Sequence, residues 1–166
     1  EDIRQNRTDI GLISTPRNQY KIDHDLHFHK LFHSKMKAYV SRYFPLAART
    51  SISPNQLIRQ SIVLHNSRPV LAFAEHIKEK YKNLTVLLTT NKLEIVKKSV
   101  MEEGNLTLFA EEYARRDPEV ISGDIVAFSI SGYTKDFLTY GWIYSKKSDL
   151  QETARDFVRF ANALLT

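Results

Sequence analysis

The stretch that decides the fold class is SIVLHNSRPVLAFAEHIKEKYKNLTVLL, residues 61–88. A short apolar run at 61–64 is followed by an amphipathic stretch at 68–81, and a second apolar run follows at 84–88. Short apolar runs are typical of buried strands, and the period of the middle stretch predicts a helix. Because a helix between two strands is the usual crossover of a parallel sheet, these residues predict a βαβ unit.

The same pattern continues downstream. Ser67 is a suitable N-cap for the first helix, and Asn91 with Glu94 predicts a capping box at the start of a second. That second helix is expected to end at Gly104, before an apolar strand at 106–109. Strands that alternate with helices in this way predict an α/β fold with a largely parallel sheet.

The flanking segments predict mainly strands. An apolar run at 9–13 predicts a strand, which is expected to end where the polar residues Ser14 and Thr15 begin. Residues 26–40 alternate with period two, which predicts two half-buried strands or one bent strand. Two further strands are predicted at 124–129 and 137–144, and an amphipathic helix at 150–165, capped by Ser148 and Gln151.

Composition excludes several classes of protein. With 42% hydrophobic and 26% charged residues, the 166-residue chain resembles a globular domain, and its short apolar runs do not span a bilayer. The absence of cysteine excludes a disulfide scaffold and thiolate chemistry. The net charge of +5 comes from the first hundred residues. Solvated helix faces explain that charge best, ahead of contacts between subunits and direct contact with DNA.

Enzyme motifs are missing from the sequence, which predicts that the protein is not an enzyme. There is no glycine-rich phosphate loop, no nucleophile elbow and no His-Glu-x-x-His helix. The carboxylates at 111 and 112 look like a solvent-facing helix start. A cluster of histidines and aspartates fits either a metal site or a polar strand face, and we favour the strand face; its members are Asp23, His24, Asp25, His27, His29 and His33.

Small hydroxyl and amide side chains gather where predicted strands end. Ser14 and Thr15 follow one strand, and Thr89, Thr90 and Asn91 follow another at the start of a helix. Ligands of parallel α/β sheets bind beyond the carboxyl ends of strands, where free helix N–H groups attract anions. Routine helix capping is an equally good explanation, since it accounts fully for Asn91 and for Ser67.

The order of these motifs resembles the effector-binding domain of LysR-type transcriptional regulators. The most specific match is Phe44-Pro45-Leu46-Ala47 followed by Ile52-Ser53-Pro54-Asn55-Gln56-Leu57. Weaker matches are the strand at 9–12, the segment from Thr89 to Asn91 with Val100 and 106–109, the return strand at 123–126, and Ala154, Arg155 and Phe157 in the last helix. Glu103 and Asn105 stand where the family has two glycines, and Ala110 where it has a proline.

The resemblance implies a two-lobed, periplasmic-binding-protein-like (type 2) fold whose lobes are joined by two crossing strands. Lobe I would comprise residues 1–36 and 130–166, and lobe II residues 37–129. The family's first strand, first helix and second strand would precede Glu1, so that lobe I is expected to be incomplete here. A winged helix-turn-helix for DNA binding is also expected upstream.

The resemblance further implies a cytoplasmic sensor that binds a small metabolite between its lobes and works as a homodimer or tetramer. DNA would be bound only through the upstream domain, and no cofactor, metal or membrane is expected. The effector contacts would fall on Ser14, Thr15, Lys35, Thr89, Thr90 and Asn91. Hydroxyl, N–H and ammonium groups suit a carboxylate or a phosphate. The alternatives are an interaction or dimerisation module that binds no metabolite and, least favoured, a metal-dependent enzyme that uses the histidines.

Overall fold

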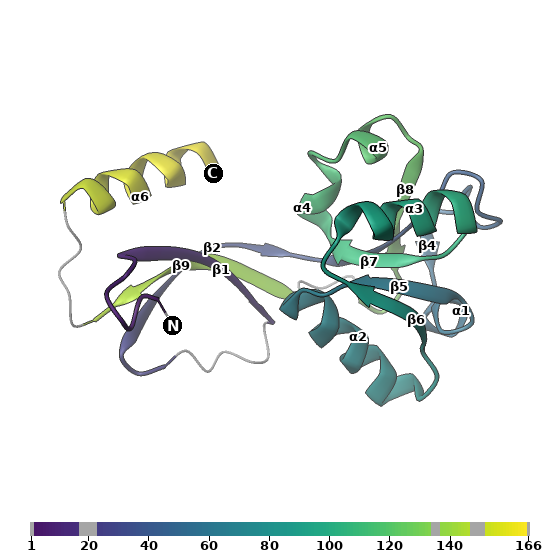
Figure 1. The fold of residues 1–166 in the computed structure, drawn as a ribbon, viewed down its shortest axis with the longest axis horizontal. Helices are drawn as coiled ribbons and strands as arrows, with labels where there is room; N and C mark the ends of the chain where they lie inside the picture. Colours follow the sequence, from purple (N-terminus) through teal and green to yellow (C-terminus); the bar gives the residue numbers. More distant parts are fainter. Residues whose placement is uncertain (1, 17–22, 134–136, 147–151, 166) are drawn as a thin grey trace. The chain divides into compact units, whose positions relative to one another are not determined.

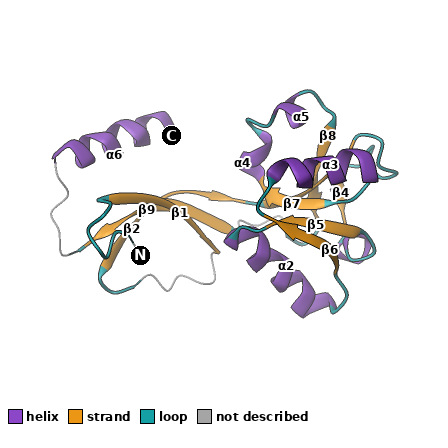
Figure 2. Ribbon diagram, in the orientation of Figure 1, coloured by secondary structure: helices purple, strands orange, loops and turns teal. Residues whose placement is uncertain are grey.

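The structure is a computed structural model that describes residues 2–16, 23–133, 137–146 and 152–165. The chain divides into two compact units, shown in Figure 1. Unit 1 comprises Glu1–His33 and Leu138–Thr166, and unit 2 comprises Ser34–Phe137. Helices and strands alternate through much of unit 2, as Figure 2 shows, so the predicted α/β class is confirmed.

The described part of unit 2 is built on six strands. One sheet has the order β4-β8-β3-β7, and a second pairs β5 with β6. Hydrogen bonds of Leu106, which precedes β7, join the two sheets, since its carbonyl accepts from Val63 N in β5 at 2.9 Å. The strands are β3 (Met36–Ser41), β4 (Ser51–Ile52), β5 (Ser61–His65), β6 (Thr85–Thr90), β7 (Thr107–Ala110) and β8 (Ile125–Ile130).

The predicted βαβ unit is confirmed. β5 and β6 are parallel, and α2 (Arg68–Tyr81) connects them. The prediction of a largely parallel sheet is wrong for the four-stranded sheet. That sheet is mixed, because β3 runs antiparallel to both β7 and β8. The other helices of unit 2 are α1 (Pro54–Leu57), α3 (Leu93–Glu103), α4 (Glu111–Ala114) and α5 (Pro118–Ile121).

The core of unit 2 lies on both faces of this sheet. In Figure 1, α2 and α3 cover opposite faces. The α2 helix buries Phe73 and Ile77 completely, and α3 does the same with Val96 and Val100. Burial of each such side chain stabilises the fold by about 1.5–3 kcal/mol. This packing fixes the ends of the strands from which the candidate site is built.

Two of the predicted helix boundaries are confirmed and one is wrong. Ser67 is the N-cap of α2, and Gly104 ends α3 with a left-handed φ of 71°. The predicted capping box of Asn91 and Glu94 does not form, because α3 begins one residue later, with Lys92 as N-cap. The hydroxyl of Thr90 accepts from Lys92 N at 3.1 Å, so a turn made by this threonine sets the helix start.

Unit 1 contains a three-stranded sheet of order β1-β9-β2. Its elements are β1 (Ile10–Pro16), β2 (Leu26–Ser34, whose last residue belongs to unit 2), β9 (Leu138–Ser145) and α6 (Glu152–Leu165). β1 pairs antiparallel with β9 as far as Pro16. The prediction that the first strand ends before Ser14 and Thr15 is therefore wrong, since β9 offers these residues the partners Tyr140 and Thr139.

The predicted C-terminal helix is present as α6, but its apolar stripe is largely uncovered. Phe157 and Leu164 are 52% and 71% exposed. Contacts to β9 come from Trp142, whose indole N–H donates to Asn162 Oδ1 at 2.8 Å. The expected cap at Ser148 and Gln151 lies outside the described residues. Within the described part of the chain, the helices are too short and too polar to cross a membrane.

Candidate functional site

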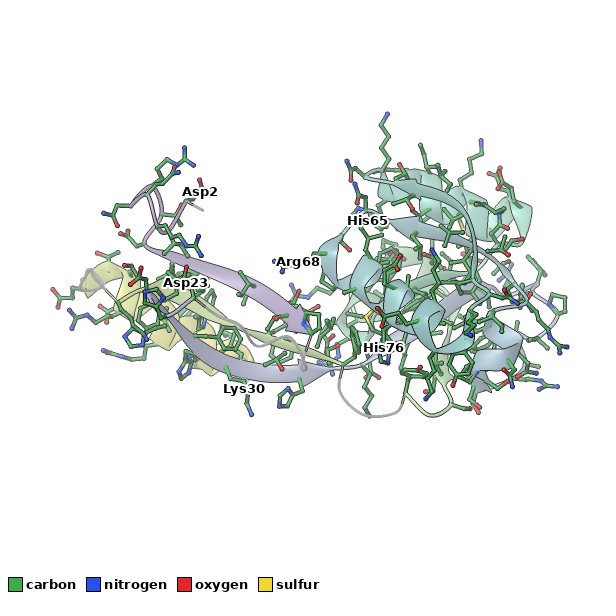
Figure 3. All side chains as sticks on the ribbon, turned by 90° about the horizontal axis from the view of Figure 1, so that it is seen from below. Asp2, Asp23, Lys30, His65, Arg68 and His76 are labelled. Carbon is green, nitrogen blue, oxygen red and sulfur yellow. The ribbon has the colours of Figure 1, made fainter. Side chains whose placement is uncertain are left out.

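The carboxyl ends of four strands meet at one edge of the unit 2 sheet. His65 and Thr90, the last residues of β5 and β6, are paired in register. β7 ends at Ala110 opposite Met36 of β3, and Ser129 near the end of β8 is paired with Lys37. Figure 3 shows His65 and Arg68 at this edge, which is the edge predicted to bind a ligand.

Thr90 is the predicted site residue that accepts hydrogen bonds with both its carbonyl and its hydroxyl. Its carbonyl accepts from Asn66 N at 2.8 Å, and its hydroxyl accepts from Lys92 N at 3.1 Å. A hydroxyl that accepts in this way keeps its own O–H free to donate to a ligand. Thr89 and Asn91 flank it and are exposed to solvent.

Lys35 lies at the opposite part of the same edge. It occupies the break between β2 and β3, and its carbonyl accepts from Glu111 N at 2.9 Å. β7 and β5 lie between β3 and β6, so that roughly 14 Å separates the strand positions next to Lys35 and Thr90. Lys35 and Thr90 therefore lie at the same edge of the sheet but are not neighbours.

A small hollow adjoins Lys35. Its volume is about 50 Å³, and its walls come from β3, β8 and the turn after β8. It is lined by Lys35, Met36, Lys37, Ser129, Ile130 and Tyr133. Sequence reasoning missed Lys37 and Ser129, because only strand register shows that the two residues are neighbours across β3 and β8.

Two carboxylates of α4 also face this region, contrary to the expectation of a solvent-facing helix start. Lys37 Nζ lies 2.7 Å from Glu111 Oε1. That hydrogen bond, with the charges of Lys37, Lys35 and Arg115, lowers the pKa of Glu111, although burial opposes the shift. Ser34 donates a hydrogen bond from its hydroxyl to the Glu112 carboxylate. The charges beside the hollow are therefore fixed by α4.

A second charged cluster joins α3 to α5 and is structural. Lys97 Nζ lies 2.7 Å from Asp117 Oδ2 and 2.5 Å from Glu119 Oε2. Burial raises the pKa of Asp117, but hydrogen bonds led by that from Lys97 outweigh it, so the net shift is downward. Asp117 also caps α5 by accepting from Glu119 N at 3.2 Å. With all its partners inside the fold, Asp117 has little left to offer a ligand.

The remaining predicted residues, Ser14 and Thr15, lie in unit 1. Both are half-buried within β1, opposite Tyr140 and Thr139 of β9. The structure therefore places the predicted effector residues in two groups, one in each unit. Within unit 2 the group consists of Lys35, Thr89, Thr90 and Asn91.

The histidines of β2 have the features of a polar strand face. His27 and His29 are exposed, and the His27 ring packs against that of Tyr144 at a tilt of 32°, with centroids 5.1 Å apart. Among the described residues, the possible metal ligands that lie within 4.8 Å of one another are Asp23, His24 and Asp25. Asp23 is already bonded to Arg4 and to the backbone N–H of Asp25. That geometry is accounted for by a turn and an ion pair.

Comparisons with known proteins agree with this architecture. The family model of the LysR substrate binding domain matches residues 1–166. The regulatory domain of CcmR from Synechocystis PCC6803, solved in complex with 2-PG, has a TM-score of 0.81 at 16% identity, covering 99% of this chain and 77% of that one. The effector binding domain of QuiR, solved with shikimate, has a TM-score of 0.72 at 15% identity, covering 98% and 74%.

Longer regulators share the same fold. HinK, a LysR family transcriptional regulator from Pseudomonas aeruginosa, has a TM-score of 0.78 at 15% identity over 99% of this chain. The chain spans 55% of that protein's length. None of the curated proteins matches the chain in sequence. These likenesses confirm the expected two-lobed, periplasmic-binding-protein-like (type 2) fold.

Proposed function

Because the chain belongs to the LysR substrate-binding domain family, we propose that it is the part of a transcription regulator that senses a small anionic metabolite. The observation that carries the proposal is the edge of unit 2 where strand ends, hydroxyl groups and lysines come together. The small molecules named for the CcmR and QuiR domains support the same kind of role.

The site we propose uses the residues named from the sequence: Ser14, Thr15, Lys35, Thr89, Thr90 and Asn91. In unit 2, Thr90 has an O–H to donate, and the ammonium of Lys35 has no ion-pair partner among the described residues. An ammonium group and hydroxyl donors together favour a carboxylate or a phosphate over a neutral ligand. In unit 1, Ser14 and Thr15 supply further hydroxyl groups.

The regulator would work as an oligomer. We propose that the complete protein is a cytoplasmic homodimer or tetramer that binds DNA through a separate domain and changes its arrangement on DNA when the metabolite binds. A ligand can shift such an equilibrium only through its difference in affinity for the two arrangements. Moving the balance from 1:99 to 99:1 requires roughly 5.5 kcal/mol.

Thr90 offers the sharpest test of the site. In the complete regulator, Thr90→Ala should weaken the response to the metabolite roughly tenfold, the effect of about 1.4 kcal/mol from one lost hydrogen bond. DNA affinity should stay unchanged. Thr90→Ser keeps the hydroxyl and the turn to Lys92, so it serves as the control. The site assignment fails if Thr90→Ala and Thr90→Ser respond alike, or if Thr90→Ala loses DNA affinity equally.

One observation favours a second candidate, an interaction module that binds no metabolite. At the two positions where the family has glycine, Asn105 Nδ2 donates to Ser99 Oγ at 2.8 Å and to Glu103 Oε2 at 3.0 Å. Side chains therefore form hydrogen bonds at the end of α3, where two glycines would have no side chain to offer. Normal DNA binding by the complete protein, with no stabilisation by any metabolite, would support this candidate.

A further inference from the structure

Lys35 and Lys37 bring two ammonium groups to one small hollow of unit 2. The hollow has a volume of about 50 Å³, and Ser129 lines it beside them. Because Lys37 and Ser129 are paired across neighbouring strands, their side chains project from the same face of the sheet. A volume of this size has room for a few water molecules. It is suited to one oxyanion group of a ligand rather than to a whole metabolite.

Glu111 is the anion that pairs with Lys37, and it also contacts the backbone of Lys35. Its Oε1 lies 2.7 Å from Lys37 Nζ, and its backbone N–H donates to the carbonyl of Lys35 at 2.9 Å. The backbone contact holds the carboxylate next to the hollow. The lowered pKa of Glu111 shows that the surrounding cations already stabilise a negative charge at this position.

The positive charge here exceeds what Glu111 can neutralise. Lys37 is paired with Glu111, whereas Lys35 has no ion pair among the described residues. The neighbouring carboxylate of Glu112 accepts a hydrogen bond from Ser34. The charges of Lys35, Lys37 and Arg115 all lower the pKa of Glu111, so three cations stand against the two carboxylates of Glu111 and Glu112, which leaves a net attraction for a further anion.

We propose that Lys35, Lys37 and Ser129 form an anion subsite, and that Glu111 is a tethered competitor which a carboxylate or phosphate group displaces from Lys37. The subsite deepens the proposed function, on which it rests, because it would hold the charged end of the metabolite. A neutral compound cannot replace the charge of Glu111. The competitor therefore selects for anionic ligands and sets their affinity.

Removal of the competitor gives a direct test. The ¹⁵N-labelled chain is titrated at constant ionic strength with inorganic phosphate and, separately, with acetate, and amide shifts are followed by NMR. In Glu111→Gln the apparent Kd of the binding anion should fall roughly threefold to fivefold, in line with the free energy of a partly exposed ion pair. The amides of Lys35, Lys37 and Ser129 should shift, and Lys37→Met should abolish the binding.

Glu102→Gln is the matched control, because Glu102 also pairs with a lysine of unit 2, Lys98 at 3.8 Å, but is exposed and away from the hollow. Its Kd should equal that of the wild type. Binding of phosphate alone identifies a phosphate ester as the ligand class, and binding of acetate alone identifies a carboxylate. The proposal is overturned if Glu111→Gln binds both anions no more tightly than the wild type, or if the shifts lie elsewhere.

The two proposals fail separately. If a metabolite screen finds no ligand while Glu111→Gln binds phosphate at the hollow, the sensing function is rejected and the anion subsite stands. If a metabolite binds at Thr90 while Glu111→Gln changes nothing, the sensing function stands and the competitor role of Glu111 is rejected.

Discussion

At the scale of single residues, the charges of Asp117 and Lys35 are used in different ways. Asp117 is only 6% exposed, yet it caps α5 and pairs with Lys97. Lys35, by contrast, has an ammonium group without an ion pair among the described residues. Because no ion pair of the described fold uses this ammonium group, we propose that it serves a ligand at this edge.

Asp117→Ala should lower the free energy of unfolding by about 2–4 kcal/mol at pH 7. The variant removes an N-cap, which costs about 1 kcal/mol, and leaves the ammonium of Lys97 with one carboxylate in place of two. Urea denaturation measures the difference. As a control, Glu102→Ala breaks the exposed pair with Lys98 and should change stability by less than about 0.5 kcal/mol. An equal effect of the two variants would contradict the structural role of Asp117.

The same residue predicts a dependence on pH. The pKa of Asp117 is lowered in the folded state, so its stabilising contribution is complete above the unfolded pKa near 3.8. The contribution is lost as pH falls through the folded pKa. The difference in stability between the wild type and Asp117→Ala should therefore shrink below about pH 4. A difference that stays constant from pH 7 down to pH 2 would show that the ion pair is not its source.

At the scale of elements, β9 depends on a close approach that only glycine permits. A Cβ on Gly141 would lie 2.5 Å from the carbonyl oxygen of His29 and 2.5 Å from Phe28 Cζ. A backbone oxygen cannot move aside without a shift of β2. At Gly11 of β1, the nearest atoms to an added Cβ would be side-chain atoms, Ile143 Cγ2 and Ile3 Cδ1, both at the longer distance of 3.3 Å.

Gly141→Ala should therefore destabilise the three-stranded sheet by about 3 kcal/mol, whereas Gly11→Ala should cost less than about 1 kcal/mol. The fluorescence of Trp142, the single tryptophan, reports on this sheet directly, because the residue lies in β9. Chemical denaturation followed by that signal compares the two variants. Similar midpoints for both would show that β2 and β9 are not packed as closely as described.

The sequence predicts correctly those elements that are determined by the pattern of neighbouring residues. The apolar periods of α2 and α3 and the left-handed cap at Gly104 all follow from neighbouring residues. The extension of β1 through Ser14 and Thr15 could not be predicted, because their partners lie in β9, more than a hundred residues away. The same reason hid the pairing of Lys37 with Glu111 and with Ser129, which depends on strand register.

At the scale of the whole molecule, the two units differ in how many apolar side chains they bury. Among the described residues, all but three of the buried apolar side chains lie in unit 2, and the exceptions are Pro16, Leu138 and Trp142. In unit 1, the apolar side chains of Leu12, Phe157 and Phe160 are more than half exposed. Because apolar burial is the main stabilising contribution, unit 2 should be the more stable of the two.

Hydrogen exchange should show this difference. For amides of β3 and β5, the free energy of opening should be close to that of global unfolding. For amides of β1 and α6, it should be several kcal/mol lower. Exchange followed by mass spectrometry or NMR at pH 7 measures both sets in one sample. Equal protection of β1 and β3 would mean that the two units unfold together.

The central claim, that this domain senses a small anion, is tested most directly by a thermal-shift screen of carboxylates and phosphate esters. A ligand present at a hundred times its Kd stabilises the folded state by about 2.7 kcal/mol. For a chain of this length, that should raise Tm by roughly 5–10 °C. We predict that at least one anion does so, and that its neutral analogue does not. A complete set of metabolite anions that leaves Tm unchanged would contradict the account.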